Sequence, residues 1–263
     1  MKPAHYTDRP LAGRTILVTG GGHRVGAVVA RSLAEAGADL VVHAHRSLDR
    51  AAQLAADAPT RAIALAADLE SAAAPSELLD EAARRGFEPS TLVHCAAGFL
   101  RKGALETTAG EWDRVLALNL RSFFLLSTEI ARRRGSRGGD LIAIADAAAV
   151  ELWPGYFAHS IAKAGLVALV RGLAKALAPL YRVNAVMPGP VLPPEETSAD
   201  ELEAMAARTL LQRLGRPEHV AQAVLFLLTC DYATGSVVEV TGGSTLWRGS
   251  ARALPDPPAP ERS

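Results

Sequence analysis

The amino-acid sequence predicts an α/β fold, with a doubly wound parallel sheet of about seven strands and helices on both faces. Short apolar runs of strand length alternate with longer alanine-rich stretches along the chain. Such alternation is typical of strands joined by right-handed helical crossovers, which make neighbouring strands parallel. The apolar runs are nearly continuous, as expected for strands covered on both faces. No break in composition divides the 263 residues, so we expect a single domain with an ample core.

The expected strands and helices follow one another in alternating order. Seven apolar runs are predicted as strands, at residues 15–19, 39–45, 62–67, 91–97, 140–145, 181–187 and 236–240. Six stretches between them are predicted as helices, at residues 25–36, 48–57, 74–85, 111–134, 157–178 and 218–229. We assign residues 11–248 to the domain, and we expect the polar residues 1–10 and the Pro-rich residues 249–263 to be flexible.

The composition argues against several classes of function. The chain has 28 Lys and Arg against 28 Asp and Glu, so no excess of charge favours binding to nucleic acid or to an anionic membrane. No apolar run is long enough to span a bilayer, and the first residues lack the apolar core of a secretory signal. Cys95 and Cys230 have no disulfide or metal-ligand pattern, so we interpret them as buried reduced thiols. We therefore expect a cytoplasmic protein without a metal site.

A glycine-rich turn follows the first expected strand in the run ILVTGGGHRVGAVVARSL. Glycine permits positive φ and lets the backbone approach a diphosphate closely, and the N-terminus of the next helix then faces that anion. A plain tight turn would also use glycine. The position directly after the first strand is what favours a dinucleotide site in a Rossmann-type fold. The candidate cofactor residues in this turn are Gly20, Gly22, Arg24, Val25 and Gly26.

The end of the second expected strand indicates the choice between NAD and NADP, because a carboxylate there would bind the ribose 2′-hydroxyl. The residues at this place are His45, Arg46 and Ser47, with no carboxylate among them. The planar guanidinium of Arg46 and the hydroxyl of Ser47 suit a 2′-phosphate, and Arg24 adds a second positive charge. A solvated loop role is the alternative for Arg46. We predict NADP(H) as the cofactor.

Asp68 and Leu69 follow the third expected strand in the run AADLES. The Asp68 carboxylate could accept a hydrogen bond from an adenine amino group. It could also cap the next helix, and the two roles are compatible. We include both residues among the candidate cofactor contacts.

Residues from about 12 to 247 resemble the short-chain dehydrogenase/reductase family. The matching runs are, in order, TGGGHRVG, ADL, EWDRVLALNLRSFF, IAKAGLVALVRGLAKAL, RVNAVMPGPV and ATGSVVEVTGGSTL. Within the family, the sequence is most similar to the pteridine-reductase-like branch. Arg24 stands in the glycine turn where most members have a glycine, and the run HAHRS and Asp146 are further points of likeness. The resemblance implies an NADP-dependent oxidoreductase with the Rossmann-type fold predicted above.

The resemblance also places residues after the fourth and sixth strands at the cofactor. The family usually has Asn-Asn-Ala-Gly after the fourth strand, whereas residues 94–97 of this chain are His-Cys-Ala-Ala. A main-chain contact from Ala96 to the adenosine side could survive this change. Pro188 and Gly189, after the sixth strand, would border the nicotinamide.

For catalysis, the resemblance implies a tyrosine that donates a proton and a lysine four residues later that holds the nicotinamide ribose. The lysine is Lys163, but His159 stands in the place of the tyrosine. Both lie on one helix face, and histidine can act as a general acid. Its ring nitrogen lies roughly 2 Å closer to Cα than a tyrosine hydroxyl does, which argues against a simple exchange. Asn119 matches an asparagine that supports a water relay, and a purely structural role is the alternative.

Three further residues are candidates for the substrate side. Asp146 stands where most of the family has a serine, and in the pteridine-reductase-like branch the aspartate there faces the substrate. Capping of a turn is the alternative role for Asp146. Phe99 matches an aromatic residue that sandwiches a flat ring against the nicotinamide, although a core role fits it nearly as well. Tyr156 suits the substrate pocket better than the acid role. A loop with a short helix is expected at 190–209, in the place of the family's substrate lid.

These residues predict an NADPH-dependent reductase that transfers hydride to a pterin-like or other C=N or C=O molecule, with His159 in place of the usual tyrosine. Two alternatives stay open. One is an NADP(H)-binding sensor or scaffold without turnover. The other is a general 3-oxoacyl or ketone reductase, against which Asp146 argues. The helices expected at 111–134 and 157–178 carry more apolar residues than one sheet contact needs, and the resemblance implies that they form the interface of a homodimer or homotetramer.

Overall fold

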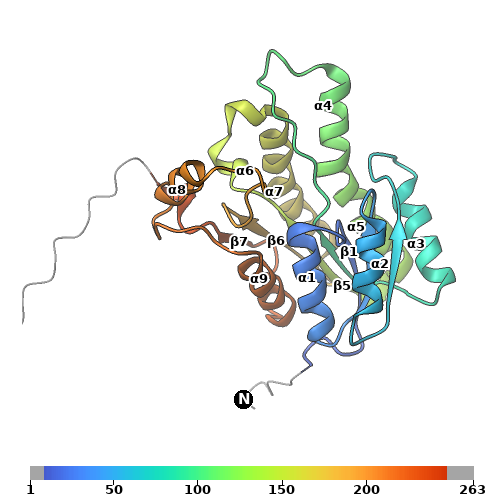
Figure 1. Cartoon of the computed structure of the whole chain (residues 1–263). Coiled ribbons are helices and arrows are strands. Elements are labelled where there is room, and N and C mark those ends of the chain that lie inside the picture. The colour runs from blue at the N-terminus through green and yellow to red at the C-terminus, as the bar shows by residue number, and fades with distance from the viewer. Residues whose placement is uncertain (1–8, 248–263) are drawn as a thin grey trace, which may run out of the picture.

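The structure is a computed structural model that describes residues 9–247. Its centre is a sheet of seven parallel strands in the order β3-β2-β1-β4-β5-β6-β7 (Figure 1). The strands are β1 (Thr15–Thr19), β2 (Asp39–Ala44), β3 (Ala62–Ala66), β4 (Thr91–His94), β5 (Gly139–Ile144), β6 (Tyr181–Pro188) and β7 (Val237–Val240). The doubly wound parallel sheet expected from the sequence is therefore confirmed.

Helices cover both faces of this sheet. One face packs against α3 (Ala74–Arg84), α5 (Ser122–Arg134) and α7 (Phe157–Leu177). The opposite face packs against α1 (Arg24–Glu35), α2 (Leu48–Ala56) and α9 (Pro217–Thr229). Three further helices lie beyond the carboxyl ends of the strands, in the upper part of Figure 1: α4 (Ala109–Leu116), α6 (Ala148–Glu151) and α8 (Ala199–Ala207).

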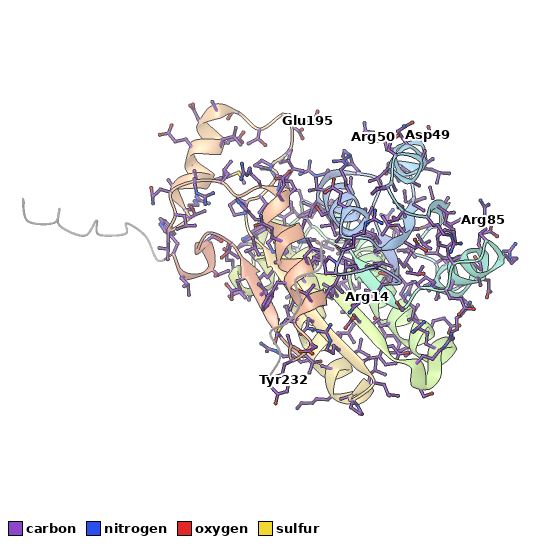
Figure 2. All side chains as sticks on the ribbon, turned by 90° about the horizontal axis from the view of Figure 1, so that it is seen from below. Arg14, Asp49, Arg50, Arg85, Glu195 and Tyr232 are labelled. Carbon is purple, nitrogen blue, oxygen red and sulfur yellow. The ribbon has the colours of Figure 1, made fainter. Side chains whose placement is uncertain are left out.

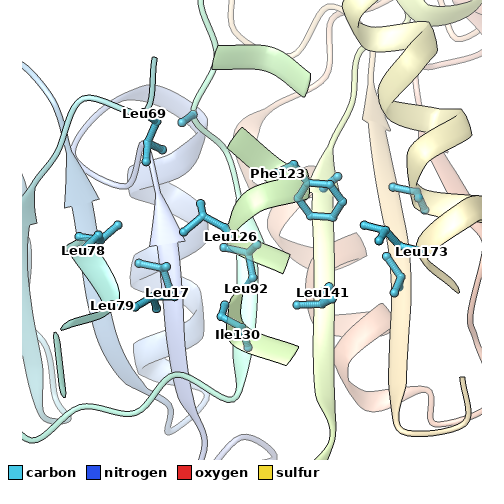
Figure 3. Packing of buried hydrophobic residues seen from close by; sticks show 14 of the residues in the cluster. Leu17, Leu69, Leu78, Leu79, Leu92, Phe123, Leu126, Ile130, Leu141 and Leu173 are labelled. Atoms are coloured by element: carbon cyan, nitrogen blue, oxygen red, sulfur yellow. The ribbon is translucent and has the colours of Figure 1, made fainter. Parts of the chain in front are cut away.

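The continuous apolar runs of the sequence are explained by side chains that alternate between the two covered faces. Leu17 of β1 belongs to the buried cluster of α3, α5 and α7, whereas Ile16 and Val18 on either side belong to the cluster of α1, α2 and α9. Figure 3 shows Leu17 in the first cluster together with Phe123 and Leu126 of α5. Each of these side chains is fully buried, which contributes roughly 1.5–3 kcal/mol per side chain to folding.

The order of the strands reverses between β1 and β4, which are neighbours although two strands separate them in the sequence. The carboxyl ends of these strands lie side by side, and the N–H of Cys95 donates to Thr19 O at 3.1 Å. In doubly wound sheets, ligands bind outside the carboxyl ends of the strands at such a reversal. We therefore expect the binding site at the loops that follow β1, β4, β5 and β6.

The single helix expected at 111–134 is wrong in its middle part, because α4 and α5 are separated by a π-helical turn, Ala117–Arg121. The side-chain Nδ2 of Asn119 donates to Val115 O at 3.0 Å, and this carbonyl would accept the N–H of Asn119 in a regular α-helix. The N–H of Ser122 instead reaches back five residues to Ala117 O. Such turns inside α-helices are frequent at functional sites.

Other expectations from the sequence are met to differing degrees. The short helix expected within 190–209 is α8, whereas α6 was not expected. The tails expected at 1–10 and 249–263 lie outside the described residues, apart from residues 9 and 10. Cys95 and Cys230 are free in the described part of the chain, but both are half-buried and not fully buried. Among residues 9–247, no helix is both long enough and apolar enough to cross a membrane.

The amino-terminal edge of the sheet, opposite the expected site, is held by charged side chains. Asp140 at the start of β5 pairs with Arg14 at 2.8 Å and with Arg182 of β6 at 2.7 Å. Arg182 also donates to Cys230 O at 2.6 Å, at the end of α9. Figure 2 views the molecule from below, with Arg14 near the middle and Tyr232 at the periphery. The charged side chains at this edge are thus used in ion pairs and hydrogen bonds within the protein, and the candidate site lies at the opposite edge.

Candidate active site

The glycine turn between β1 and α1 is shaped by close main-chain contacts. Gly20 has a φ of +64° and donates its N–H to His43 Nδ1 at 3.3 Å. A Cβ atom at Gly26 would lie 2.1 Å from Gly20 O, and one at Gly22 would lie 2.7 Å from Ser47 O. Glycine is therefore required at these two positions. The tight turn leaves the first amides of α1 available to an anion, as a diphosphate site needs.

Arg24 begins α1 in the left-handed region of backbone conformation, with a φ of +51°. This region is unfavourable for residues other than glycine, so the backbone at Arg24 is strained. The exposed side chain donates a hydrogen bond to Leu192 O, in the loop between β6 and α8. Arg24 thus joins the glycine turn to the loop expected to be the substrate lid.

The residues predicted to bind a 2′-phosphate lie at the carboxyl end of β2. His45 and Arg46 are exposed, and Ser47 is half-buried at the start of α2. The hydroxyl of Ser47 would lie 2.8 Å from a Cβ atom at Gly22. The segment 45–47 therefore borders the glycine turn, as a site for the adenosine ribose requires.

Asp68 and Leu69 differ in their surroundings. Asp68 is exposed, and its Oδ1 accepts a hydrogen bond from the N–H of Glu70 at 3.0 Å. It therefore caps the turn after β3, while α3 begins only at Ala74. Leu69 is buried in the cluster on the α3 face, and Val25, in the first turn of α1, packs against the opposite cluster.

His43, which the sequence analysis did not assign to the site, joins the carboxyl ends of three strands. Its Nδ1 accepts the N–H of Gly20 after β1, and its Nε2 donates to Ala67 O after β3 at 3.1 Å. Burial lowers the pKa of His43 to about 4, so the ring is neutral at pH 7. A neutral imidazole has one donor and one acceptor, and here both are used.

His94 joins β1, β4 and the π-helical turn in the same way. Its Nδ1 lies 2.8 Å from Thr19 Oγ1, and its Nε2 lies 3.1 Å from Ser122 Oγ. Ser122 Oγ donates to Leu118 O, so it accepts from the ring. Thr19 Oγ1 in turn accepts the N–H of Ala96 at 3.2 Å. Burial, with a smaller effect of the Lys163 charge, lowers the pKa of His94 to about 3, which keeps this chain of bonds neutral.

The other residues predicted to contact the cofactor lie on the same edge of the sheet. Ala96 is so close to Gly20 that a Cβ atom on Gly20 would lie 2.9 Å from the Ala96 backbone. Pro188 O, at the end of β6, accepts the N–H of Ala147 at 2.9 Å. Gly189 follows, and its N–H donates to Val240 O at 3.0 Å. The loops after β1, β4, β5 and β6 are thus joined by main-chain contacts.

Lys163 of α7 is buried, and its Nζ donates to Ile144 O at the end of β5 at 2.9 Å. Burial lowers the pKa of Lys163, and the nearby carboxylate of Asp146 acts in the opposite direction. The ammonium group is therefore held at the carboxyl edge by one backbone carbonyl and lies in the field of Asp146.

Asn119 is fully buried and binds the backbone of Gly98 in the loop after β4. Its Oδ1 accepts the N–H of Gly98 at 3.3 Å, and its Nδ2 donates to Gly98 O at 3.1 Å. With the further bond to Val115 O, both hydrogens of the amide are used. The side chain of Asn119 therefore fixes the position of Gly98, and its part in a water relay stays a prediction.

His159 and Asp146 face each other at the centre of the site. His159 Nε2 lies 3.6 Å from Asp146 Oδ2, and His159 Nδ1 donates to Gly98 O at 3.2 Å. The other carboxylate oxygen, Oδ1, accepts the N–H of Ala148 at 2.8 Å. Asp146 therefore caps the turn at α6 with one oxygen and presents the other to the histidine, while its role toward a substrate stays a prediction.

Phe99 and Tyr156 lie beside this pair. The ring of Phe99 stacks on the ring of His159 with a centroid distance of 4.2 Å, while Tyr156 meets Phe99 edge-on at 6.3 Å. Phe99 is 63% exposed, so a core role does not fit it. Tyr156 precedes the first residue of α7 and contacts Trp153 as well. The sequence-predicted catalytic and substrate residues are thus brought together in one cluster.

Comparison with known proteins assigns the chain to a family. A family model described as enoyl-(acyl carrier protein) reductase matches residues 22–245. Versicolorin reductase 1 of Aspergillus parasiticus is 31% identical over 255 residues, which cover 89% of this chain and 97% of the relative. The chain belongs to the short-chain dehydrogenase/reductase family. The members of this family are oxidoreductases that use nicotinamide cofactors.

Solved structures of short-chain dehydrogenases/reductases share the fold over nearly the whole chain. A dehydrogenase/reductase from Sinorhizobium meliloti 1021 has a TM-score of 0.84 at 31% identity, and the match covers 90% of this chain and 97% of that protein. FolM alternative dihydrofolate reductase 1 from Brucella canis, complexed with NADP, has a TM-score of 0.86 at 28% identity, covering 94% and 100%. Solved structures of this family, one of them in complex with NADP, are therefore similar to this chain.

The short-chain dehydrogenase/reductase pattern explains which site residues the sequence could predict. Lys163 and the glycine turn stand at positions that the family pattern marks. Gly98 was missed, because its role consists of backbone groups that bind Asn119 and His159. The imidazoles at positions 43 and 94 were missed as well, although both stand at strand ends beside the reversal of strand order. Among the described residues, no group of three or more His, Cys, Asp or Glu side chains is arranged to hold a metal ion.

Proposed function

We propose that this short-chain dehydrogenase/reductase is an NADPH-dependent reductase acting on a pterin-like or other flat C=N or C=O substrate. The observation that carries the proposal is the cluster at the carboxyl edge of the sheet. There Asp146 and His159 face each other, Asn119 fixes the loop that binds His159, and Lys163 lies in the field of Asp146. Such a group of buried titratable side chains beside a cofactor turn is typical of an active site.

The proposed choice of NADPH rests on the end of β2. His45 and Arg46 are exposed there, next to the hydroxyl of Ser47, and these side chains suit a 2′-phosphate. The diphosphate would be held by the main chain of the turn at Gly20, Gly22 and Gly26. The structures of the similar FolM proteins from Brucella were obtained with NADP, which supports this choice.

The proposed substrate class rests on Asp146 and Phe99. A carboxylate oxygen that is not used by the backbone can bind the amino and ring N–H groups of a pterin. The exposed ring of Phe99 offers a flat apolar surface on which such a heterocycle can stack. The name of the similar Brucella protein, alternative dihydrofolate reductase, points to the same substrate class.

The residues of this chain would act as follows. When bound, NADPH supplies the hydride. Lys163 would hold the nicotinamide ribose and keep a positive charge beside the reacting atoms. Asp146 and His159 would supply the proton that the reduced nitrogen or oxygen requires. Asn119 would keep Gly98, and with it His159, in place.

The proposed activity is tested by binding and turnover with the purified protein. Titration calorimetry is expected to show tighter binding of NADPH than of NADH, with a smaller difference in Arg46→Ala. NADPH oxidation is then followed by absorbance with a panel of dihydropterins and ketones. Oxidation with a dihydropterin supports the proposal, and oxidation with ketones alone would support the general ketone reductase. Binding of NADPH without oxidation by any compound would contradict a reductase and support a sensor.

We also propose that the chain forms a homodimer or homotetramer in the cytoplasm. Phe124 of α5 is a large apolar side chain that is 41% exposed on one of the helices expected at an interface. Light scattering is expected to give at least twice the chain mass of 27.6 kDa, and a mass of one chain would contradict the proposal.

A further inference from the structure

The tautomer of His159 follows from its hydrogen bond to Gly98. A carbonyl oxygen can only accept, so Nδ1 carries the hydrogen that is donated to Gly98 O at 3.2 Å. Asn119 Nδ2 donates to the same oxygen and so fixes its position. In a neutral imidazole Nε2 is then a bare acceptor. This atom is fully buried and has no hydrogen-bond partner among the described residues.

The bare nitrogen is directed at Asp146. Nε2 lies 3.6 Å from Oδ2, which is roughly 0.8 Å longer than a charge-assisted hydrogen bond. Oδ1 is occupied by the N–H of Ala148, so Oδ2 is the oxygen available to the ring. Two bare acceptors that face each other in a buried place repel, whereas one proton between them satisfies both.

Only one member of this pair can reach a substrate. The side chain of His159 is 0% exposed and is covered by the stacked ring of Phe99, whereas the side chain of Asp146 is 18% exposed. A tyrosine in the place of His159 would be longer and would carry its own transferable proton. The histidine is too short and too well covered for that role, so its chemistry must pass through Asp146.

The charge of Lys163 acts on the pair from α7. Its ammonium attracts the carboxylate of Asp146 and so favours release of a proton that the pair shares, which suits a proton donor. The Cys95 thiol and the neutral ring of His94, at the end of β4, are close enough to interact electrostatically with Lys163 as well. The ring of Tyr156 contacts the ring of Phe99 and not the His159–Asp146 pair itself. No second carboxylate among the described residues pairs with His159, so Asp146 is its acidic partner.

We propose that His159 is a positioning residue that holds one proton between its Nε2 and Asp146 Oδ2, and that Asp146 delivers this proton to the substrate. This inference rests on the proposed reductase function. In the step, hydride from the nicotinamide forms the new C–H bond, and the C=N or C=O π bond breaks. The proton leaves the pair for the substrate nitrogen or oxygen. The pair is left as a carboxylate and a neutral imidazole, and water returns the proton.

The first test compares Asp146→Asn, His159→Phe and the double variant, with NADPH and a dihydropterin as the probe. Asp146→Asn is expected to lower kcat by on the order of a hundredfold or more at every pH. His159→Phe keeps the stacking with Phe99 and is expected to lose a similar factor at pH 7. Its kcat should rise again at lower pH, because the proton delivered to the substrate must then come from water. The double variant should lose no more than Asp146→Asn alone.

Three results of this comparison would overturn the proposal. A His159→Phe enzyme that stays inactive at all pH values, beside an active Asp146→Asn enzyme, would make the histidine the donor. Losses of less than threefold in both single variants would assign the proton to water near Lys163. Additive losses in the double variant would show that the two side chains do not act as a unit. Circular dichroism at each pH and calorimetry with NADPH check that the variants are folded and bind the cofactor.

The second test does not depend on turnover, so its failure differs from failure of the proposed function. Nitrogen-15 NMR of the NADPH complex is expected to show the hydrogen of His159 on Nδ1, with Nε2 either pyridine-like or sharing a proton. The Nε2 resonance should shift in Asp146→Asn, while the Nδ1 resonance should shift in Asn119→Ala. A hydrogen on Nε2 with a bare Nδ1, or an Nε2 resonance unaffected by Asp146→Asn, would refute the shared proton even in an active enzyme.

Discussion

The glycine turn and the start of α7 each carry a residue that departs from the family pattern, with opposite consequences. At the turn, Arg24 replaces a glycine, yet the backbone keeps the left-handed conformation, at φ +51°. At α7, His159 replaces a tyrosine, and the surroundings differ as well, because Gly98 O accepts from one ring nitrogen and Asp146 faces the other at 3.6 Å. The first site is built from main-chain shape, and the second is built from side-chain chemistry.

This difference explains which kind of substitution each half of the site tolerates. A main-chain site persists as long as each residue can adopt the required φ and ψ, whatever its side chain. A proton-transfer site depends on which atoms carry hydrogens, so a single exchange requires changes in its neighbours. The two halves of the site should therefore respond differently to substitution and to acid.

The largest effect is expected at Gly26, where the main-chain shape leaves no space. In Gly26→Ala the new Cβ would lie 2.1 Å from Gly20 O, and a backbone atom cannot move aside as a side chain can. We expect NADPH binding to weaken by at least about a hundredfold, or about 2.8 kcal/mol, in titration calorimetry. Gly110→Ala in α4 is the matched control, because a Cβ atom there meets nothing within 4 Å. Wild-type affinity in Gly26→Ala would show that the turn is not the cofactor site.

The second prediction concerns acid, which should act on the buried imidazoles that support the turn. The folded-state pKa values of His43 and His94 are lowered from 6.5 to about 4 and about 3. Below pH 6.5 the unfolded chain therefore binds more protons than the folded one, so stability falls as the pH falls toward these lower values. Between pH 7 and pH 5, each of the two histidines should lower the free energy of unfolding by about 2 kcal/mol.

A variant separates this effect from general acid sensitivity. His94→Asn introduces the uncharged residue that the family has there, so its free energy of unfolding should fall by about 2 kcal/mol less than that of the wild type between pH 7 and pH 5. Urea unfolding at both pH values measures the difference. An equal loss in both proteins would mean that His94 is not held neutral by burial.

Much of the fold followed from the sequence, because the features that set it are periodic and local. The alternation of apolar runs and the position of the glycine turn predicted the sheet and its parallel order. The π-helical turn did not follow, because it depends on a bond from the Asn119 side chain to Val115 O that no pattern of apolar residues encodes. In the site, residue types suggested Asp146 and His159, but the 3.6 Å between them depends on how β5 and α7 are placed in space.

The third prediction tests the side-chain half through Asn119. In Asn119→Ala the N–H of Gly98 loses its side-chain acceptor, which should lower the free energy of unfolding by about 1–3 kcal/mol. Because Gly98 O also fixes His159, kcat should fall more than NADPH affinity does. Ser127→Ala in the neighbouring α5 is the control, since the buried Ser127 hydroxyl has no hydrogen-bond partner within residues 9–247 and its loss should cost nothing. A stable Asn119→Ala protein with unchanged kcat would separate Gly98 from catalysis.

The smallest effect is expected at Arg24, where the backbone strain of the folded state and the freedom of the unfolded chain have opposite effects on stability. The left-handed conformation of Arg24 destabilises the folded protein by about 1–2 kcal/mol, and Arg24→Gly relieves this cost. Glycine, however, has more conformational freedom in the unfolded chain, which destabilises the folded protein by about 0.5–1 kcal/mol. The net gain in thermal stability should therefore be small, about 0.5 kcal/mol. NADPH affinity should fall about fivefold, or about 1 kcal/mol, because a cation and the contact to Leu192 O are lost. Gln212→Gly, at a φ of +52°, should give a similar stabilisation without the loss of affinity. If Arg24→Gly bound NADPH as tightly as the wild type, main-chain shape alone would account for the turn, and the strained arginine would have to act on the loop before α8.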